Sequence, residues 1–209
     1  MELIEAMTTQ RAIRRLKPDP VDDETLMRVL SLAVKAPTGS NRQGWEWIVV
    51  RDPKVKRKLG RRLRAAFRLY GGAGRRITRN DPKQQRNLDA VAWQAEHFEE
   101  IPVIVVACLH GASFPYPWVA RSSRYGSIYP AIQNLLLAAR AEGLGAALTT
   151  LPLWNQVAAR IALRLPPNVE PVAVIPMGWP LGRYGPTTRR PIEEITHLDR
   201  YGNRAFAKA

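Results

Sequence analysis

The chain has 209 residues, a size that suits one domain with its own hydrophobic core. It is 45% hydrophobic and 24% charged, as globular proteins are, and no apolar run approaches the roughly 20 residues needed to cross a bilayer. The formal net charge of +14 makes nucleic acid or another polyanion a partner to consider. Acidic residues near the start, where a secretory signal needs positive charge, lead us to expect a cytoplasmic location without membrane association.

The first part of the chain is predicted to be helical on either side of a proline-rich break. Hydrophobic periodicity favours a helix over residues 2–14, with a basic cluster at its end. Residues 17–20, Lys-Pro-Asp-Pro, break it, because a residue before proline is pushed toward extended backbone. Asp22 or Asp23 then caps a helix that ends at Pro37.

The middle of the chain alternates strands and helices. Aromatic and β-branched residues predict a strand over 45–50, and residues 52–53, Asp-Pro, are typical of the start of a helix. We expect that helix to end at residues 71–74, a flexible glycine-rich connector whose spacing is not that of a phosphate-binding loop. A helix from 81 to about 100 and an apolar strand over 102–109 follow.

The last predicted elements lead into an aperiodic C-terminus. Strands separated by helices favour a sheet with helices on its faces, in a single domain that covers residues 1–209. The final stretch, about 180–209, lacks periodicity and is expected to be an extended arm. Between 111 and the arm we expect an irregular segment over 111–126, an apolar helix over 127–142 that stops at Gly143, a strand over 146–150, a helix over 155–164 and a strand over 172–177.

Side chains that commonly carry catalysis are sparse. The three histidines, His97, His110 and His197, lack the spacing of metal ligands, so no metal site is expected. Cys108 lies in an apolar run and is interpreted as a buried, unreactive thiol. Because no serine elbow or converging carboxylate pair is found either, the sequence favours an enzyme whose cofactor performs the chemistry.

Two arginine clusters lie near opposite ends of the chain. The first is Arg11-Ala12-Ile13-Arg14-Arg15, and the second is Arg189-Arg190 before Pro191. The planar fork of an arginine side chain matches phosphate oxygens in pairs. The clusters therefore indicate a site for the phosphate of a nucleotide-like cofactor.

These clusters belong to an ordered set of segments that resembles the FMN-dependent nitroreductase family over nearly the whole chain. The segments are 11–14 (Arg-Ala-Ile-Arg), 37–45 (Pro-Thr-Gly-Ser-Asn-Arg-Gln-Gly-Trp), 143–145 (Gly-Leu-Gly), 178–180 (Gly-Trp-Pro) and 189–191 (Arg-Arg-Pro). The resemblance implies an α+β fold with a mixed central sheet flanked by helices. It also implies a homodimer in which each C-terminal arm is exchanged between subunits, with FMN bound at the interface.

The function implied by the resemblance is a ping-pong transfer of hydride. NADH or NADPH would reduce flavin N5, and a small-molecule acceptor such as a nitroaromatic or a quinone would then be reduced from the same atom. No side chain of this chain is expected to be catalytic in that scheme. The sequence does not identify the physiological acceptor or the preferred nicotinamide.

The resemblance also assigns cofactor-binding residues. Ala12 stands where the family has serine, so a hydroxyl contact is lost while the backbone N–H remains, and Gly44 replaces a proline in the loop before Trp45. Arg64 and Arg68 are candidates for the pyrimidine edge of the flavin. The implied phosphate group is Arg11, Ala12, Arg14, Arg15, Arg189 and Arg190; the implied flavin-ring group is Pro37, Thr38, Gly39, Asn41 and Gln43, with Thr149, Thr150 and Leu151 near N5.

Two alternatives stay open. A basic stretch over residues 54–79 would suit a polyanion- or nucleic-acid-binding protein built on the same fold, or it is simply a solvated helix face. A specialised flavoenzyme of the superfamily is the other alternative: a dehalogenase, an azoline oxidase or a flavin-degrading enzyme. The residues that distinguish such enzymes lie in variable lids, here within 111–126.

Overall fold

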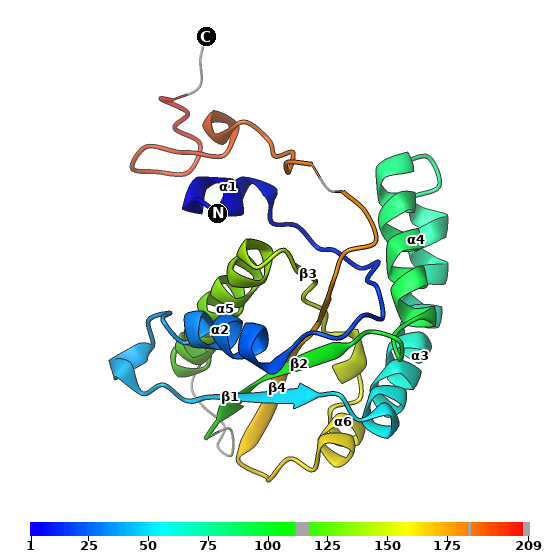
Figure 1. Cartoon of the computed structure of the whole chain (residues 1–209). Coiled ribbons are helices and arrows are strands. Elements are labelled where there is room, and N and C mark those ends of the chain that lie inside the picture. The colour runs from blue at the N-terminus through cyan, green and yellow to red at the C-terminus, as the bar shows by residue number, and fades with distance from the viewer. Residues whose placement is uncertain (112–117, 184, 207–209) are drawn as a thin grey trace.

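The computed structural model describes residues 1–111, 118–183 and 185–206. Within them, four strands form one sheet in the order β1-β2-β4-β3, and every pair of neighbouring strands is antiparallel. Helices cover both faces of this sheet (Figure 1), which confirms the predicted α+β class. The strands are β1 (Trp45–Val50), β2 (Val103–His110), β3 (Gly145–Ala146) and β4 (Val169–Gly178).

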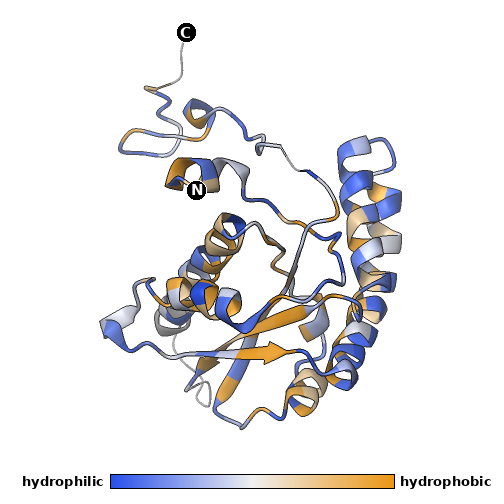
Figure 2. Ribbon diagram, in the orientation of Figure 1, coloured by the Kyte–Doolittle hydropathy of each residue, from blue (hydrophilic) through white to orange (hydrophobic). Residues whose placement is uncertain are grey.

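The central strands separate two hydrophobic cores. Along β2, Val103 and Val105 lie in one core, while Ile104 and Val106 lie in the other. This double burial explains why the strand shows no alternation of polar and apolar residues. Figure 2 shows the strands coloured as hydrophobic beneath helices with mixed surfaces. The first core is covered by α2 (Asp23–Ala33) and α5 (Trp118–Ala141), and the second by α3 (Pro53–Ile77), α4 (Pro82–Glu96) and α6 (Gln156–Leu163).

Helices start where the capping residues predict. The Asp22 carboxylate accepts the Thr25 N–H at 2.7 Å, and Asp52 accepts the Lys54 N–H at 2.6 Å. Asp81 caps α4 in the same way. These contacts satisfy amide groups that have no partner within the first turn of a helix.

The N-terminal helix is shorter than predicted. Helix α1 covers Leu3–Thr9, not residues 2–14. Beyond it the chain is extended, since the Ile13 N–H donates to the Ala146 carbonyl at 3.0 Å and the Lys17 N–H donates to the Trp179 carbonyl at 2.8 Å. Tertiary pairing has overridden the local helical pattern.

The glycine-rich residues 71–74 are not a connector but part of α3, which continues to Ile77. A Cβ on Gly71 would lie 2.8 Å from the Phe67 ring of the same helix, so this ring packs over the glycine, and a Cβ on Gly74 would be in ordinary contact with Leu88 of α4, 3.4 Å away. The glycines therefore lie within one continuous helix whose Gly74 faces α4, and α4 itself ends at Glu96.

The expectation of an irregular segment over 111–126 is also partly wrong. Helix α5 begins at Trp118, so residues 118–126 are helical, while 112–117 lie outside the described residues. Gly143 follows this helix with φ +79°, as its predicted role as a left-handed stop requires. The predicted strand over 146–150 is reduced to β3 and a single bridge between Thr149 and Val174.

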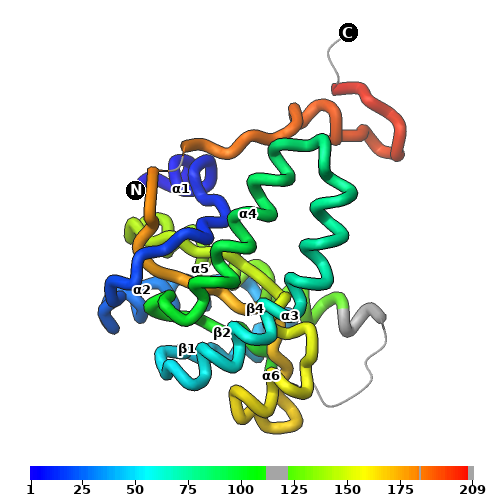
Figure 3. The backbone as a smooth tube through the Cα atoms, turned by 90° about the vertical axis from the view of Figure 1, so that its right-hand side faces the viewer, coloured from blue at the N-terminus to red at the C-terminus, as the bar shows by residue number. Residues whose placement is uncertain are grey.

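The C-terminal arm lies against the start of the chain. After β4, the arm contains one short 3-10 helix, η3 (Ile192–Glu194), within the described residues. The Thr187 N–H donates to the Thr8 carbonyl at 2.9 Å, and Thr187 Oγ1 donates to the same oxygen at 3.2 Å. Figures 1 and 3 both show the arm passing α1 before it extends away from the body of the chain.

Gly145 permits the pairing of the extended N-terminal segment, so we expect Gly145→Ala to destabilise the fold. A Cβ there would lie 2.6 Å from Ile13 Cγ2 and 2.9 Å from Leu16 Cδ2. Overpacking of this kind costs about 1–3 kcal/mol of unfolding free energy, measurable by urea denaturation. Gly72→Ala is the control: Gly72 is an exposed helical glycine with nothing within 4 Å, and this change should leave stability unchanged or raise it. Equal stability of the two variants would contradict the close packing.

Cys108 is expected to resist alkylation in the folded protein. Its side chain is fully buried in β2, and burial raises the pKa of the thiol from 9.0 to about 12. The thiolate fraction at pH 8 then falls about a thousandfold, because each pKa unit is a factor of ten. Because the pKa is raised on folding, the thiol's contribution to stability is present below pH 9 and is lost as the pH rises toward 12. Iodoacetamide labelling followed by mass spectrometry, with and without denaturant, tests this, and rapid native labelling would refute it.

Candidate cofactor site

Arginines from both ends of the chain line one cavity of about 440 Å³, which we call the arginine cavity. Arg11 and Arg14 come from the segment after α1, and Arg189 comes from the C-terminal arm. Residues of α3 and α4 complete the wall. Figure 3 shows these two helices running side by side as a hairpin. The other lining residues are Ala12, Tyr70, Lys83, Gln84, Asn87, Leu88, Val91, Thr187 and Thr188.

The first side of the cavity is fixed by the extended segment 11–17. Ile13 and Leu16 are buried against the core, and the Arg15 carbonyl accepts the Leu181 N–H at 3.0 Å. Leu16 also pairs with Pro180 as an isolated bridge. The segment is therefore held between β3 and the start of the arm, which places Arg14 at the cavity.

The second side is fixed by the arm. The pairing of Thr187 with Thr8 holds the arm beside the N-terminal segment, and Arg11 Nη1 donates to the Gly185 carbonyl at 3.4 Å. Arg189 Nη1 donates to the Thr188 carbonyl at 2.9 Å. Hydrogen bonds thus join the two ends of the chain where their arginines meet.

The arginine cavity is strongly cationic. No aspartate or glutamate lines it, and Arg11, Arg14, Arg189 and Lys83 form no ion pair with another described residue. Arg14 is half-buried, and burial lowers the pKa of its guanidinium. A bound anion would offset this cost of desolvation, and a phosphate dianion matches arginine geometry. The residues present therefore fit a phosphate group.

Not every predicted phosphate residue reaches the cavity. Arg15 and Arg190 are exposed and do not line it, whereas Ala12 does. Arg64 pairs instead with Glu99, at 2.8 Å, and this pair, together with Arg57, lowers the pKa of the Glu99 carboxyl. Arg68 is exposed and lies outside the lining as well. In their place α3 brings Tyr70 to the cavity.

Sequence reasoning missed Tyr70 and the α4 residues. Their side chains reach the cavity because α3 continues through residues 71–74 and α4 folds back along it. The periodicity of Lys83, Asn87 and Val91, at i, i+4 and i+8, was the signal available, since it places these three side chains on one helix face. Which other segments this helix face lies against is decided by the tertiary fold and cannot be read from the periodicity.

The loop 37–43 is the second group of predicted residues and carries backbone strain. Ser40, Asn41 and Gln43 have φ near +50°, a conformation that is uncommon outside glycine. The Gln43 N–H donates to Thr38 Oγ1 at 3.1 Å, and Gln43 Nε2 donates to Asn41 Oδ1 at 3.0 Å. These internal hydrogen bonds stabilise the strained shape.

Thr38 and Gly39 line a separate cavity of about 470 Å³, with His110 and Ser127. Figure 1 shows that loop 37–43, which contains η1 (Gly39–Asn41), lies at the opposite side of the molecule from segment 11–17. The two groups of predicted residues therefore line separate cavities within one chain.

The third group, Thr149 to Leu151, follows β3. Thr149 exchanges two backbone hydrogen bonds of 2.9 Å with Val174, and the Leu151 N–H donates to Thr149 Oγ1 at 3.3 Å. Leu151 opens the 3-10 helix η2 (Leu151–Leu153), which packs against α3. This segment is therefore anchored to the same sheet edge as segment 11–17.

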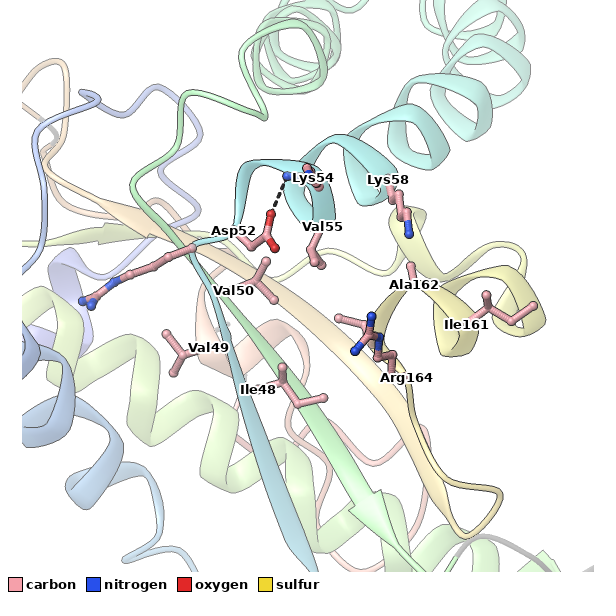
Figure 4. Close-up of a pocket in the computed structure, with 12 residues that line it drawn as sticks. Ile48, Val49, Val50, Asp52, Lys54, Val55, Lys58, Ile161, Ala162 and Arg164 are labelled. Atoms are coloured by element: carbon pink, nitrogen blue, oxygen red, sulfur yellow. Dashed lines mark hydrogen bonds between the residues drawn. The ribbon is translucent and has the colours of Figure 1, made fainter.

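A further cavity, of about 400 Å³, lies beside β1 and contains none of the predicted residues. Figure 4 shows Ile48 and Val50 of β1 facing Val55 and Arg164 across it. Among the described residues, β1 pairs with β2 and with no strand on its other edge.

The described part of the chain holds no group of three or more His, Cys, Asp or Glu side chains that could bind a metal ion. In the same residues, no helix combines the length and apolar character needed to span a membrane.

Comparison with known proteins agrees with the geometry. An NADH dehydrogenase of Thermus thermophilus is 28% identical, over 91% of this chain and 92% of its own. An iodotyrosine deiodinase of Nematostella vectensis is 23% identical, over 94% of this chain and 75% of its own length. A solved structure from Desulfovibrio desulfuricans, assigned as a nitroreductase and in complex with FMN, shares the fold with a TM-score of 0.72. The two chains are 23% identical, and the match covers 96% of this chain and 98% of that one.

The family itself is shown by a match that covers most of the chain. Residues 7–179 match the Nitroreductase family. The match includes segment 11–17, loop 37–43 and residues 149–151, and it ends where the arm begins. This protein belongs to the nitroreductase family of oxidoreductases.

Proposed function

We propose that the protein is an FMN-dependent oxidoreductase that transfers hydride from NADH or NADPH to a small acceptor such as a nitroaromatic or a quinone. The observation that carries this proposal is the meeting of Arg11, Arg14 and Arg189 in one cavity without acidic residues. Family membership supports it. So does the FMN bound in the Desulfovibrio neighbour.

In this proposal the residues of the chain bind and orient. Arg11, Arg14 and Arg189 would hold the cofactor phosphate, and the backbone of residues 149–151 would lie against the flavin ring. When bound, FMN supplies the atom that accepts and donates hydride, so no catalytic side chain is required. Positive charge around the phosphate contributes binding energy, while the open surroundings of loop 37–43 leave room for different acceptors.

The site is complete only in a homodimer. Loop 37–43 and the arginine cavity lie at opposite sides of one chain and line separate cavities (Figure 1), so we propose that the partner's loop covers the flavin. The outer edge of β1 could then receive the partner's arm, whose residues beyond 190 extend away from their own chain (Figure 1).

A dehalogenase is the second candidate within the same family, because iodotyrosine deiodinase is among the relatives.

The polyanion-binding alternative has less support. Within the basic stretch 54–79, Arg57 and Arg64 pair with Glu99, and Arg75 pairs with Asp89 at 2.8 Å. Part of its charge is therefore neutralised by acidic residues of α4 and of the segment that follows it.

The absorbance spectrum of the purified protein tests the proposed function directly. We expect bands near 370 and 450 nm, roughly as for any oxidised flavin, that bleach on anaerobic addition of NADH or NADPH and recover when a quinone is added. Turnover of 3-iodotyrosine by the reduced protein would favour the dehalogenase. A protein that stays colourless after incubation with FMN, and that binds DNA at moderate salt, would contradict the proposal.

The phosphate assignment predicts different effects for neighbouring arginines. Arg11→Ala combined with Arg189→Ala should weaken FMN binding about a hundredfold or more, because each charge-assisted hydrogen bond contributes about 1.5–3 kcal/mol. Arg190→Ala, outside the cavity, should change it little. Equilibrium dialysis measures the FMN affinity of the unmodified protein, the double variant and the Arg190→Ala variant, and circular dichroism checks that each is folded. Equal affinities would show that the phosphate binds elsewhere.

A further inference from the structure

We infer that helix α4 supplies a further phosphate-binding residue, Lys83, with Asn87 beside it as a neutral donor, so that the α3–α4 hairpin forms one wall of the cofactor-phosphate site. The inference rests on the proposed function and deepens it. Both residues lie outside the motifs by which the sequence resembles its family. They line the arginine cavity together with Arg11, Arg14 and Arg189.

The geometry of α4 presents these two side chains on one helix face. Lys83 and Asn87 are four positions apart in α4, and Val91, four positions further along, lines the same cavity. Residues at i and i+4 are neighbours on a helix surface. Lys83 and Asn87 are exposed in the single chain, so both side chains are available to a ligand.

The hairpin is held firmly enough to serve as a wall. The Asp81 carboxylate accepts the backbone N–H groups of Lys83 and Gln84, at 2.9 and 3.0 Å, and so fixes the first turn of α4. Gln85 Nε2 donates to the Thr78 carbonyl at 2.9 Å across the hairpin turn. With Leu88 packed near Gly74, these contacts set the position of Lys83 relative to α3.

Charge and donor chemistry identify the occupant as a phosphate. Lys83 is the fourth cation of a cavity that no carboxylate lines, and it forms no ion pair with a described residue. A phosphate monoester carries nearly two negative charges and several acceptor oxygens. Ala12 offers no side-chain donor, whereas the Asn87 amide does. The hairpin thus replaces a donor that the N-terminal segment lacks.

The test compares FMN with riboflavin, which has the same ring system without the phosphate. Binding to the cofactor-free full chain is measured by quenching of flavin fluorescence. We expect Lys83→Met to weaken FMN binding about tenfold and to leave riboflavin binding unchanged, with Lys83→Arg restoring most of the affinity. Asn87→Leu should weaken FMN binding severalfold. Arg86→Met is the matched control, since Arg86 is an exposed cation of the same helix that does not line the cavity.

The outcomes separate this inference from the proposed function. If Arg11→Ala with Arg189→Ala weakens FMN binding while Lys83→Met binds FMN as the unmodified chain does, the role of α4 is overturned and the arginine site stands. If neither change affects FMN affinity, the arginine cavity is not the phosphate site and both conclusions fail. Equal losses in Lys83→Met and Arg86→Met would reveal a general effect of charge and would also overturn the inference.

Discussion

The structure depends on the extended pairing of residues 11–17 between β3 and the start of the C-terminal arm. This pairing is short, yet it buries Ile13 and Leu16 and closes a loop of more than one hundred residues. It is possible because Gly145 has no side chain, so the segment approaches the sheet closely. Without it, Arg14 and Arg189 would belong to separate, solvated parts of the chain.

The distribution of charge follows from the same arrangement. Glu99 and Asp89 neutralise arginines of α3 through ion pairs. In the arginine cavity, by contrast, cations form a lining to which no acid contributes. Exposed ion pairs add little to stability, so the contrast matters more for binding than for folding. A high net charge thus coexists with one cavity whose charged lining residues are all cations.

Much of the fold could be predicted because its signals are local. Asp22, Asp52 and Asp81 cap helices through contacts within the next three residues, and β1 begins and ends as its composition predicts. The end of α1 and the helical state of residues 71–74 could not be read in this way. The end of α1 is followed by backbone pairing with Ala146 and Trp179, which are distant in sequence, and at residues 71–74 the helix continues with Gly71 packed against Phe67 and Gly74 near Leu88 of α4.

The candidate site likewise combines features that local sequence patterns predict with features that only the tertiary fold determines. The two arginine clusters predicted a phosphate site, and the structure brings Arg11, Arg14 and Arg189 together. The choice between Arg189 and Arg190 depends on how the arm turns after Thr187, which no sequence pattern records. Lys83 and Asn87 reach the cavity through a helical hairpin whose position beside the N-terminal segment is a tertiary property.

The contact between Arg11 and the backbone of Gly185, 174 residues apart, has a consequence for biosynthesis. During translation the first guanidinium groups leave the ribosome long before the arm that completes their surroundings. The cavity therefore cannot close around Arg11 until residues 185–189 have left the ribosome as well. A chain truncated before residue 185 would lack both this contact and the Arg189 side of the cavity.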